Sequence, residues 1–139
     1  MEDCTAGDCA SVEIGRDQYR TLINSGRHQI IADEPESLGG TDEGFTPNQL
    51  FLSGLGACTV ITLRMYADRK KWDVENIKVV VEMDTVKSEQ QRTTFVKRHI
   101  QISGNIDTDQ KNRMLEIAES CPMHKILINP IVISSNLLP

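Results

Sequence analysis

The sequence predicts an α+β fold in which antiparallel sheets pack around one central buried helix. The first observation is the stretch from Pro47 to Leu63, which has no charged residue and has apolar side chains on every side. A helix that is apolar all round belongs in a core or an interface. The second observation is that short strand-like segments precede this stretch, and that residues 77–83 after it alternate apolar and polar residues, as a half-buried strand does. We expect a single domain over residues 1–139, long enough to bury roughly two thirds of its surface.

Short strands are expected before the central helix. They cover residues 12–14, 19–23 and 27–32. Ser25 and Gly26 are typical of the turn between the last two strands. Residues 1–10 are expected to be a flexible tail, because chain ends are commonly disordered. Asp33 and Glu34 are interpreted as a solvated turn before Pro35, and a glycine-rich acidic loop over residues 38–44 then leads into the helix.

The start of the central helix carries several N-terminal signals. Thr46 is a capping residue, Pro47 suits the first helical position, and Gln49 completes a Thr-x-x-Gln capping box. The uncharged run ends at Arg64 and is shorter than the roughly 20 residues needed to cross a bilayer. A core helix is therefore the better interpretation, and we expect no membrane association.

A pair of strands is expected after the central helix. They cover residues 77–83 and 95–102. The alternating apolar residues of the first are Ile77, Val79, Val81 and Met83. A charged loop from Lys87 to Arg92 separates the two segments, so they are predicted to pair with each other.

A second helix and a last strand complete the predicted fold. The helix starts near Thr108 and is amphipathic. Its predicted buried side chains are Met114, Leu115 and Ala118. Residues 126–134 are predicted to close the sheet as an edge strand, because Pro130 cannot donate a ladder hydrogen bond.

Two cysteines lie in surroundings that favour redox chemistry. Cys58 is well inside the uncharged stretch, and Cys121 follows the second helix on its apolar side. Pro122 ends that helix and can open another, which would place the Cys121 thiol at a helix N-terminus. The helix dipole and free amides there favour a thiolate. For either cysteine alone, the alternative is an inert buried residue of the kind common in cores.

Considered together, the motifs around these cysteines resemble the OsmC/Ohr family, the osmotically inducible and organic hydroperoxide resistance proteins. They are Leu38-Gly39-Gly40, Thr-Pro-x-Gln-Leu-Phe at 46–51, Gly-Ala-Cys at 56–58, and Cys121-Pro122. Their order and spacing are specific, and the resemblance covers nearly the whole chain. The phrase Leu-Gly-Ala-Cys-Thr at 55–59, with Arg-Met-Tyr-Ala at 64–67, is closer to the OsmC-like branch of the family.

The resemblance implies a cysteine-based peroxidase without a cofactor. In the family the first cysteine attacks an organic hydroperoxide and the second resolves the product as a disulfide, so Cys58 is expected to be peroxidatic and Cys121 resolving. A dithiol of the lipoyl or thioredoxin type would be the reductant. The family's intertwined homodimer would cover the central helix between two sheets. The alternative is a non-catalytic or weakly active OsmC-like dimer that acts as a binding or structural protein.

An arginine is expected to activate Cys58, because a thiol in mid-helix gains nothing from a helix end. Free cysteine titrates near 8.5, and an adjacent arginine can lower this well below 7. The resemblance points to Arg16, because Gly-Arg-Asp at 15–17 matches a segment that the family uses for this purpose. Arg20 and Arg27 are the competing candidates. For each of them the alternative is a solvated surface charge.

One position departs from the family pattern. The family's reductases commonly carry a glutamate ten residues before the first cysteine, where it orients the arginine, and here that position is Asn48. An asparagine can hydrogen-bond a guanidinium but carries no charge. Asp42 and Glu43 in the preceding loop are the possible substitutes.

Composition argues against several other classes of function. The formal charge is −5 at pH 7 and the basic residues are scattered, so we expect no nucleic acid partner. The N-terminus is acidic and no apolar run follows it, which predicts a cytoplasmic protein without a signal peptide. We expect Cys4 and Cys9 to be incidental thiols of the flexible tail, with no metal bound. The weaker alternative is a zinc site. Its ligands would be Cys4, Cys9, Cys121 and His124.

Overall fold

The structure, a computed structural model, describes residues 4–139 and confirms the predicted α+β class with antiparallel sheets. The chain divides into two compact units. The N-terminal unit ends at Phe51 and the C-terminal unit covers Leu52–Pro139. Each unit has a sheet of its own, and the long helix α1 (Pro47–Lys70) begins in the first unit and continues into the second.

The N-terminal unit contains a three-stranded antiparallel sheet in the order β1-β2-β3. The strands are β1 (Ser11–Ile14), β2 (Thr21–Ser25) and β3 (His28–Ala32), followed by the short 3-10 helix η1 (Glu36–Leu38). Ser11 lies opposite Asn24, and Thr21 lies opposite Ala32. The turn between β2 and β3 uses Gly26 at a φ of 58°, a left-handed conformation that glycine adopts without steric cost.

Residues before β1 are closed into a loop by a disulfide and attached to this sheet by hydrogen bonds. Cys4 and Cys9 are bonded, with their Cα atoms 5.7 Å apart. The Cys4 carbonyl accepts a hydrogen bond from the Gly26 amide, and the Cys9 carbonyl accepts one from the Ser25 hydroxyl, each at 2.8 Å. The expectation of unbonded, incidental thiols at these positions is therefore wrong. Residues 1–3 of the predicted tail lie outside the described residues.

A buried aspartate organises the loop that leads into α1. The Asp33 carboxylate is 1% exposed, although the sequence was interpreted here as a solvated turn. It accepts hydrogen bonds from the Thr41 hydroxyl at 2.6 Å and from the Glu43 amide at 3.1 Å. The Thr41 bond and the amide bonds outweigh the effect of burial and hold the pKa of Asp33 well below its usual range. The error arose because Asp33 comes just before Pro35, a pattern more typical of an exposed turn.

Helix α1 has the predicted N-terminus and is longer than its uncharged run. The capping box is confirmed: the Thr46 amide donates to the Gln49 side chain at 3.0 Å, and the Gln49 amide donates to the Thr46 hydroxyl at 3.2 Å. The helix continues past Arg64 to Lys70 and is long and apolar enough, by length and composition alone, to cross a membrane. Part of it is nevertheless packed inside the fold. The buried residues are Leu55, Thr59, Leu63, Tyr66 and Ala67.

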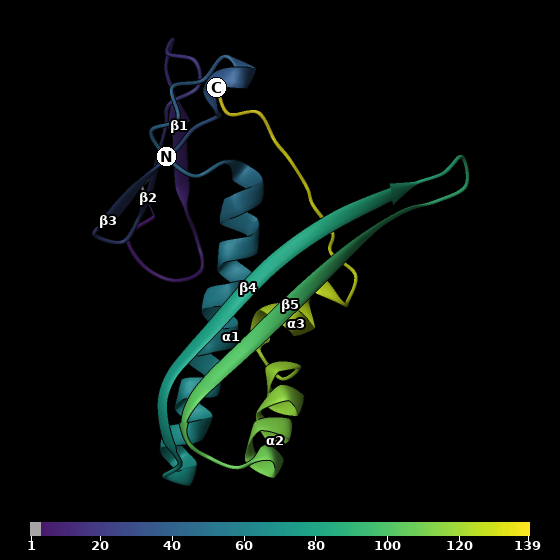
Figure 1. Cartoon of the computed structure of the whole chain (residues 1–139). Helices are drawn as coiled ribbons and strands as arrows, with labels where there is room; N and C mark the ends of the chain where they lie inside the picture. Colours follow the sequence, from purple (N-terminus) through teal and green to yellow (C-terminus); the bar gives the residue numbers. More distant parts are fainter. Residues whose placement is uncertain (1–3) are drawn as a thin grey trace. The chain divides into compact units, whose positions relative to one another are not determined.

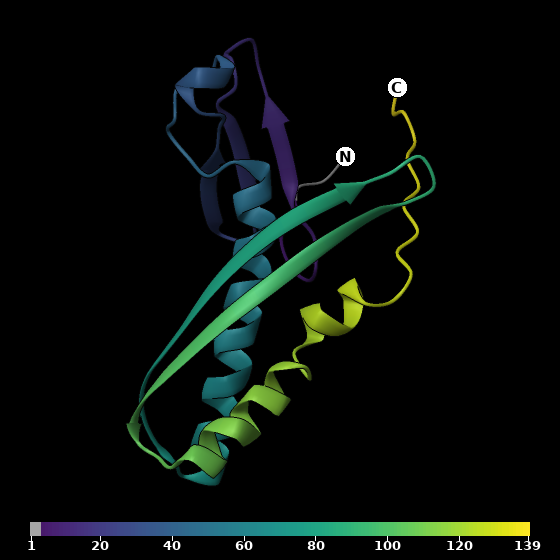
Figure 2. The same cartoon turned by 45° about the vertical axis from the view of Figure 1, so that its right-hand side comes forward.

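The C-terminal unit contains a long antiparallel hairpin of β4 (Asp73–Lys87) and β5 (Arg92–Asn105). The hairpin crosses α1 at an angle, and α2 (Thr108–Ala118) lies alongside the C-terminal half of α1 in both views (Figures 1 and 2). The core between these elements is centred on Leu63 and Met114. Its other buried members are Tyr66, Ala67, Val74 and Ala118.

Two details of the predicted C-terminal region are wrong. Leu115 was expected to be buried beside Met114 and Ala118, but it is 58% exposed, because it lies on the outer side of α2. Residues 126–134 were expected to form a strand. Instead the helix α3 (Pro122–Leu127) takes up the first two of them, and the rest pair with no strand among the described residues. Pro122 opens this helix, and Pro130 can donate no ladder hydrogen bond.

Two glycines let other elements approach α1 closely. A Cβ atom on Gly56 would lie 3.3 Å from a methyl group of Val81 in β4. A Cβ atom on Gly54 would lie 3.6 Å from the terminal methyl of Met123 in α3. The glycines therefore bring β4 and α3 against the turn of α1 that precedes Cys58.

Candidate functional site

The structure brings the two sequence-predicted cysteines together inside the C-terminal unit. Cys58 comes from the middle of α1 and is half-buried, and Cys121 is the N-cap residue of α3 and is 0% exposed. The two thiols lie close enough that each shifts the pKa of the other. Both are free cysteines, so the site is a reduced dithiol.

Cys121 has the surroundings of a thiolate, as its place before Pro122 predicted. Its sulfur accepts a hydrogen bond from the His124 amide at 3.3 Å, and the Thr59 hydroxyl lies 4.0 Å away. Burial alone would raise the pKa of Cys121. The His124 amide, the Cys58 thiol and the Thr59 hydroxyl together outweigh burial and lower this pKa below its ordinary value.

Cys58 has the opposite tendency. Burial raises the pKa of Cys58, and its hydrogen bond to Cys121 together with the charge on that sulfur raises it further. The Met123 amide and the Thr62 hydroxyl oppose this shift in part. Within this unit, Cys58 is therefore the thiol that keeps its proton, and Cys121 is the one that ionises more readily.

An arginine that the sequence analysis did not single out lies at the same site. Arg98 of β5 donates from Nη1 to the Thr59 hydroxyl and to the Ala118 carbonyl, each at 3.1 Å, and its Nη2 lies 2.7 Å from Nδ1 of His124. Arginine has only donors, so His124 Nδ1 is the acceptor and the proton of this neutral ring is on Nε2. Arg98 thus links β5 to α1, α2 and α3 around Cys121.

A signal for Arg98 was present in the strand pattern. Val96, Ile100 and Ile102 occupy the partly buried positions of β5, and Arg98 lies in the same alternation. A charged residue on the inward face of a half-buried strand requires a partner, because burial of an unpaired charge is costly. His124 could not have been assigned to Arg98 in this way, because the two lie in different elements.

The N-terminal arginines all belong to the other unit. Arg16 lies in the bend between β1 and β2, and Arg27 in the turn between β2 and β3. Arg20 is 3.6 Å from the Glu43 carboxylate, which gives Glu43 a partner within the same unit. Asn48 is exposed in the first turn of α1. The role of Arg16 at Cys58 stays a prediction.

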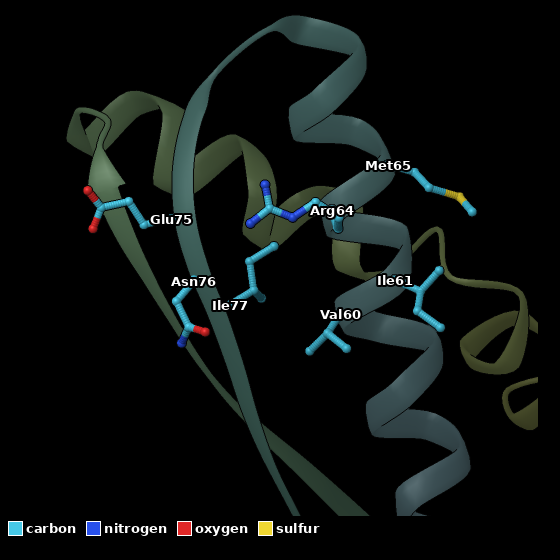
Figure 3. A pocket seen from close by; sticks show the side chains of 7 residues that line it. All are labelled: Val60, Ile61, Arg64, Met65, Glu75, Asn76 and Ile77. Atoms are coloured by element: carbon cyan, nitrogen blue, oxygen red, sulfur yellow. The ribbon is translucent and has the colours of Figure 1, made fainter.

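Cavities of different character lie around α1. One cavity, of about 360 Å³, is lined by Thr62, whose hydroxyl hydrogen-bonds to Cys58, and by Ser120, the residue before Cys121. Another, of about 230 Å³, lies beside Arg98 and His124. A third, of about 420 Å³, lies between α1 and β4. Val60 and Arg64 point across it toward Ile77, whereas Ile61 and Met65 project from the other side of the helix (Figure 3). No cysteine lines this third cavity.

Residues 4–139 contain no group of three or more histidine, cysteine or acidic side chains arranged to hold a metal ion. The zinc alternative also loses two of its four ligands, because the sulfurs of Cys4 and Cys9 are bonded to each other.

Comparisons with a family model and with solved structures point to the same family. Residues 40–136 match the family model described as OsmC-like protein, and no curated protein matches. An OsmC-like protein from Mycoplasma pneumoniae has 20% sequence identity and a TM-score of 0.74, with 86% of each chain covered. The organic hydroperoxide resistance protein OsmC from Legionella pneumophila has 22% identity and a TM-score of 0.65, covering 88% of this chain and 90% of that one. OhrB of Bacillus subtilis, an organic hydroperoxide resistance protein, has 22% identity and a TM-score of 0.60, covering 85% and 89%.

Proposed function

Because this chain belongs to the OsmC-like protein family, we propose that it is a thiol-dependent peroxidase that reduces organic hydroperoxides. The family and its hydroperoxide resistance members support a redox role connected with peroxides. The observation that carries the finer proposal is that Cys58 and Cys121, two free thiols from different elements, lie close enough to affect each other's pKa. Two free thiols this close together can form a disulfide with little movement of the chain.

In the proposed reaction, Cys58 loses its proton to solvent, and the thiolate attacks the outer oxygen of the hydroperoxide. The O–O bond breaks, Cys58 becomes a sulfenic acid, and the alkoxide takes a proton from solvent to leave as an alcohol. The Cys121 thiolate then attacks the Cys58 sulfur and displaces hydroxide, which leaves as water with a solvent proton. A dithiol of the lipoyl or thioredoxin type reduces the resulting disulfide.

Arg16 is the residue that we propose to stabilise the Cys58 thiolate during the attack, and the active form is proposed to be a homodimer. A guanidinium stays charged and donates several fixed hydrogen bonds, so it can also orient the peroxide oxygen as negative charge develops. The cytoplasm, which keeps thiols reduced, is the compartment that we propose for the reaction.

Stopped-flow measurement of organic hydroperoxide consumption, with a dithiol reductant present, tests this function. Cys58→Ser should abolish consumption. Cys121→Ser should consume one equivalent per subunit rapidly and then stop, with a trappable sulfenic acid. The matched control is the double variant Cys4→Ser/Cys9→Ser, which should turn over like the parent.

Peptide mapping after mild oxidation tests the disulfide. A bond between Cys58 and Cys121 within one subunit is expected. Equal peroxide consumption by Cys58→Ser and the parent would eliminate the peroxidase and favour the non-catalytic OsmC-like dimer. The uncharged Asn48 is the feature of the chain that agrees with that second function.

A further inference from the structure

Arg98 is well placed to act on the dithiol without touching either sulfur. Its guanidinium contacts Thr59, the neighbour of Cys58 in α1, and His124, whose amide contacts Cys121. It also holds the Ala118 carbonyl in the last turn of α2, three residues before Cys121. Each element that positions Cys121 is therefore fixed through one side chain.

The hydrogen bond from Arg98 limits which acceptors the Thr59 hydroxyl hydrogen can reach. A hydroxyl group has one hydrogen, and Arg98 donates to the Thr59 oxygen at 3.1 Å. The Thr59 hydrogen must then point to another acceptor. Two are within reach: the Leu55 carbonyl at 2.7 Å and the Cys121 sulfur at 4.0 Å. The hydroxyl can therefore turn toward the sulfur when charge develops there, while Arg98 keeps its oxygen in place.

The contact with His124 has a similar effect on the other side of the sulfur. Nη2 of Arg98 holds Nδ1 of the imidazole at 2.7 Å, which fixes the side chain of the third residue of α3. The amide of that same residue is the donor at 3.3 Å from the Cys121 sulfur. Fixing the His124 ring thus helps to hold the first turn of α3 against the thiol.

We propose that Arg98 is a positioning residue that, through Thr59 and His124, aims hydrogen-bond donors at the Cys121 sulfur and so stabilises its thiolate, the form that would resolve an oxidised Cys58. The consequence for the reaction rests on the proposed peroxidase function, whereas the effect on Cys121 does not. The alternative is that Arg98 only holds β5 against the three helices, with no influence on the thiols.

The test measures ionisation of Cys121 by the ultraviolet absorbance of its thiolate as a function of pH. Cys58→Ser is the background, and the Cys4–Cys9 disulfide is left intact, so that Cys121 is the free thiol that titrates. Absorbance is suitable because it needs no reagent to reach a buried sulfur. Arg98→Met, which keeps the length of the side chain but has no donors, should move the titration midpoint upward by about one unit, or about tenfold less thiolate below the midpoint.

A matched control removes an arginine from the same unit. Arg113→Met changes the net charge equally, but the hydrogen bonds of Arg113 go to Glu116 of α2 and to Tyr66 of α1. It should leave the midpoint unchanged. Arg98→Lys keeps the charge but cannot reproduce three directed hydrogen bonds, so its midpoint should lie between those of the parent and Arg98→Met.

The outcomes separate this proposal from the proposed function. An unmoved midpoint in both Arg98 variants, or an equal shift in Arg113→Met, would overturn it. If Arg98→Met does not fold, Thr59→Val takes its place and should shift the midpoint in the same direction by a smaller amount. Because the titration requires no peroxide, a shift in a protein that consumes no hydroperoxide would support the positioning role and reject the peroxidase.

A single-turnover experiment then asks whether Arg98 acts through Cys121. In a Cys121→Ser background, Cys58 should be oxidised at the same rate with Arg98→Met as with Arg98, because the thiol that Arg98 positions has been removed. In the presence of Cys121 the same change should slow formation of the disulfide. Equal slowing in both backgrounds would contradict action through Cys121 and assign Arg98 to Cys58 instead.

Discussion

Met114→Ala should lower the free energy of unfolding by about 3 kcal/mol. Met114 is 0% exposed, and the substitution removes its three outermost side-chain atoms from the core. Substitution of a buried leucine, isoleucine or methionine by alanine typically costs about 2–5 kcal/mol, with the larger values where the site cannot collapse. Here the surrounding residues come from α1, α2 and β4, so closing the cavity would require a helix to move against a strand.

Urea unfolding followed by far-ultraviolet circular dichroism measures this loss, at one fixed protein concentration because association shifts apparent stability. Leu115→Ala is the matched control, because Leu115 is the next residue of α2 and is 58% exposed. It should cost less than about 1 kcal/mol. A loss below about 1 kcal/mol for Met114→Ala, or equal losses for both variants, would refute the assignment of Met114 to the centre of the core.

Other predictions concern acid stability, thiol activation and assembly. The folded pKa of Asp33 is depressed, so its stabilisation is present above the unfolded value of about 3.9 and is lost as pH falls toward the folded value. The stability difference between the parent and Asp33→Asn should therefore shrink below about pH 4, and a constant difference would contradict the ionised carboxylate. In a Cys121→Ser background, Arg16→Ala should raise the midpoint of Cys58 alkylation by about one to two units, about 1.4–2.7 kcal/mol. An unchanged profile would transfer the role to Arg20 or Arg27. Sedimentation at micromolar concentration should show a homodimer, since α1 leaves large apolar side chains exposed, and a folded monomer would reject this.

Much of the fold was predictable because its signals are local. The capping box at Thr46 and the alternation of residues 77–83 are properties of neighbouring residues, and both correspond to observed elements. The last strand was wrong for a non-local reason. A strand exists only with a partner, and the apolar pattern of residues 126–134 contains no information about which strand, if any, would pair with it.

The same distinction applies to the site. The helix-terminal position of Cys121 follows from Pro122 and was correctly predicted, and the pairing of Cys58 with Cys121 followed from a family resemblance. Arg98 could not be connected to them from sequence, because its contacts join four elements that are far apart along the chain. The buried state of Asp33 was missed for a related reason, since its donors come from residues up to fourteen positions away.

The glycines of α1 have a consequence for folding. Glycine in a helix interior is less favourable than alanine by about 1 kcal/mol, so Gly54 and Gly56 weaken the intrinsic helicity of the turn before Cys58. Helical stability there must come from tertiary packing, in this case against Val81 and Met123. We therefore expect that this part of α1 is not helical in the unfolded ensemble and becomes ordered only when the β4–β5 hairpin and α3 dock. The paired environment of Cys58 and Cys121 would then form and disappear together with the C-terminal unit, so that a newly made or partly unfolded chain carries two separate, ordinary thiols.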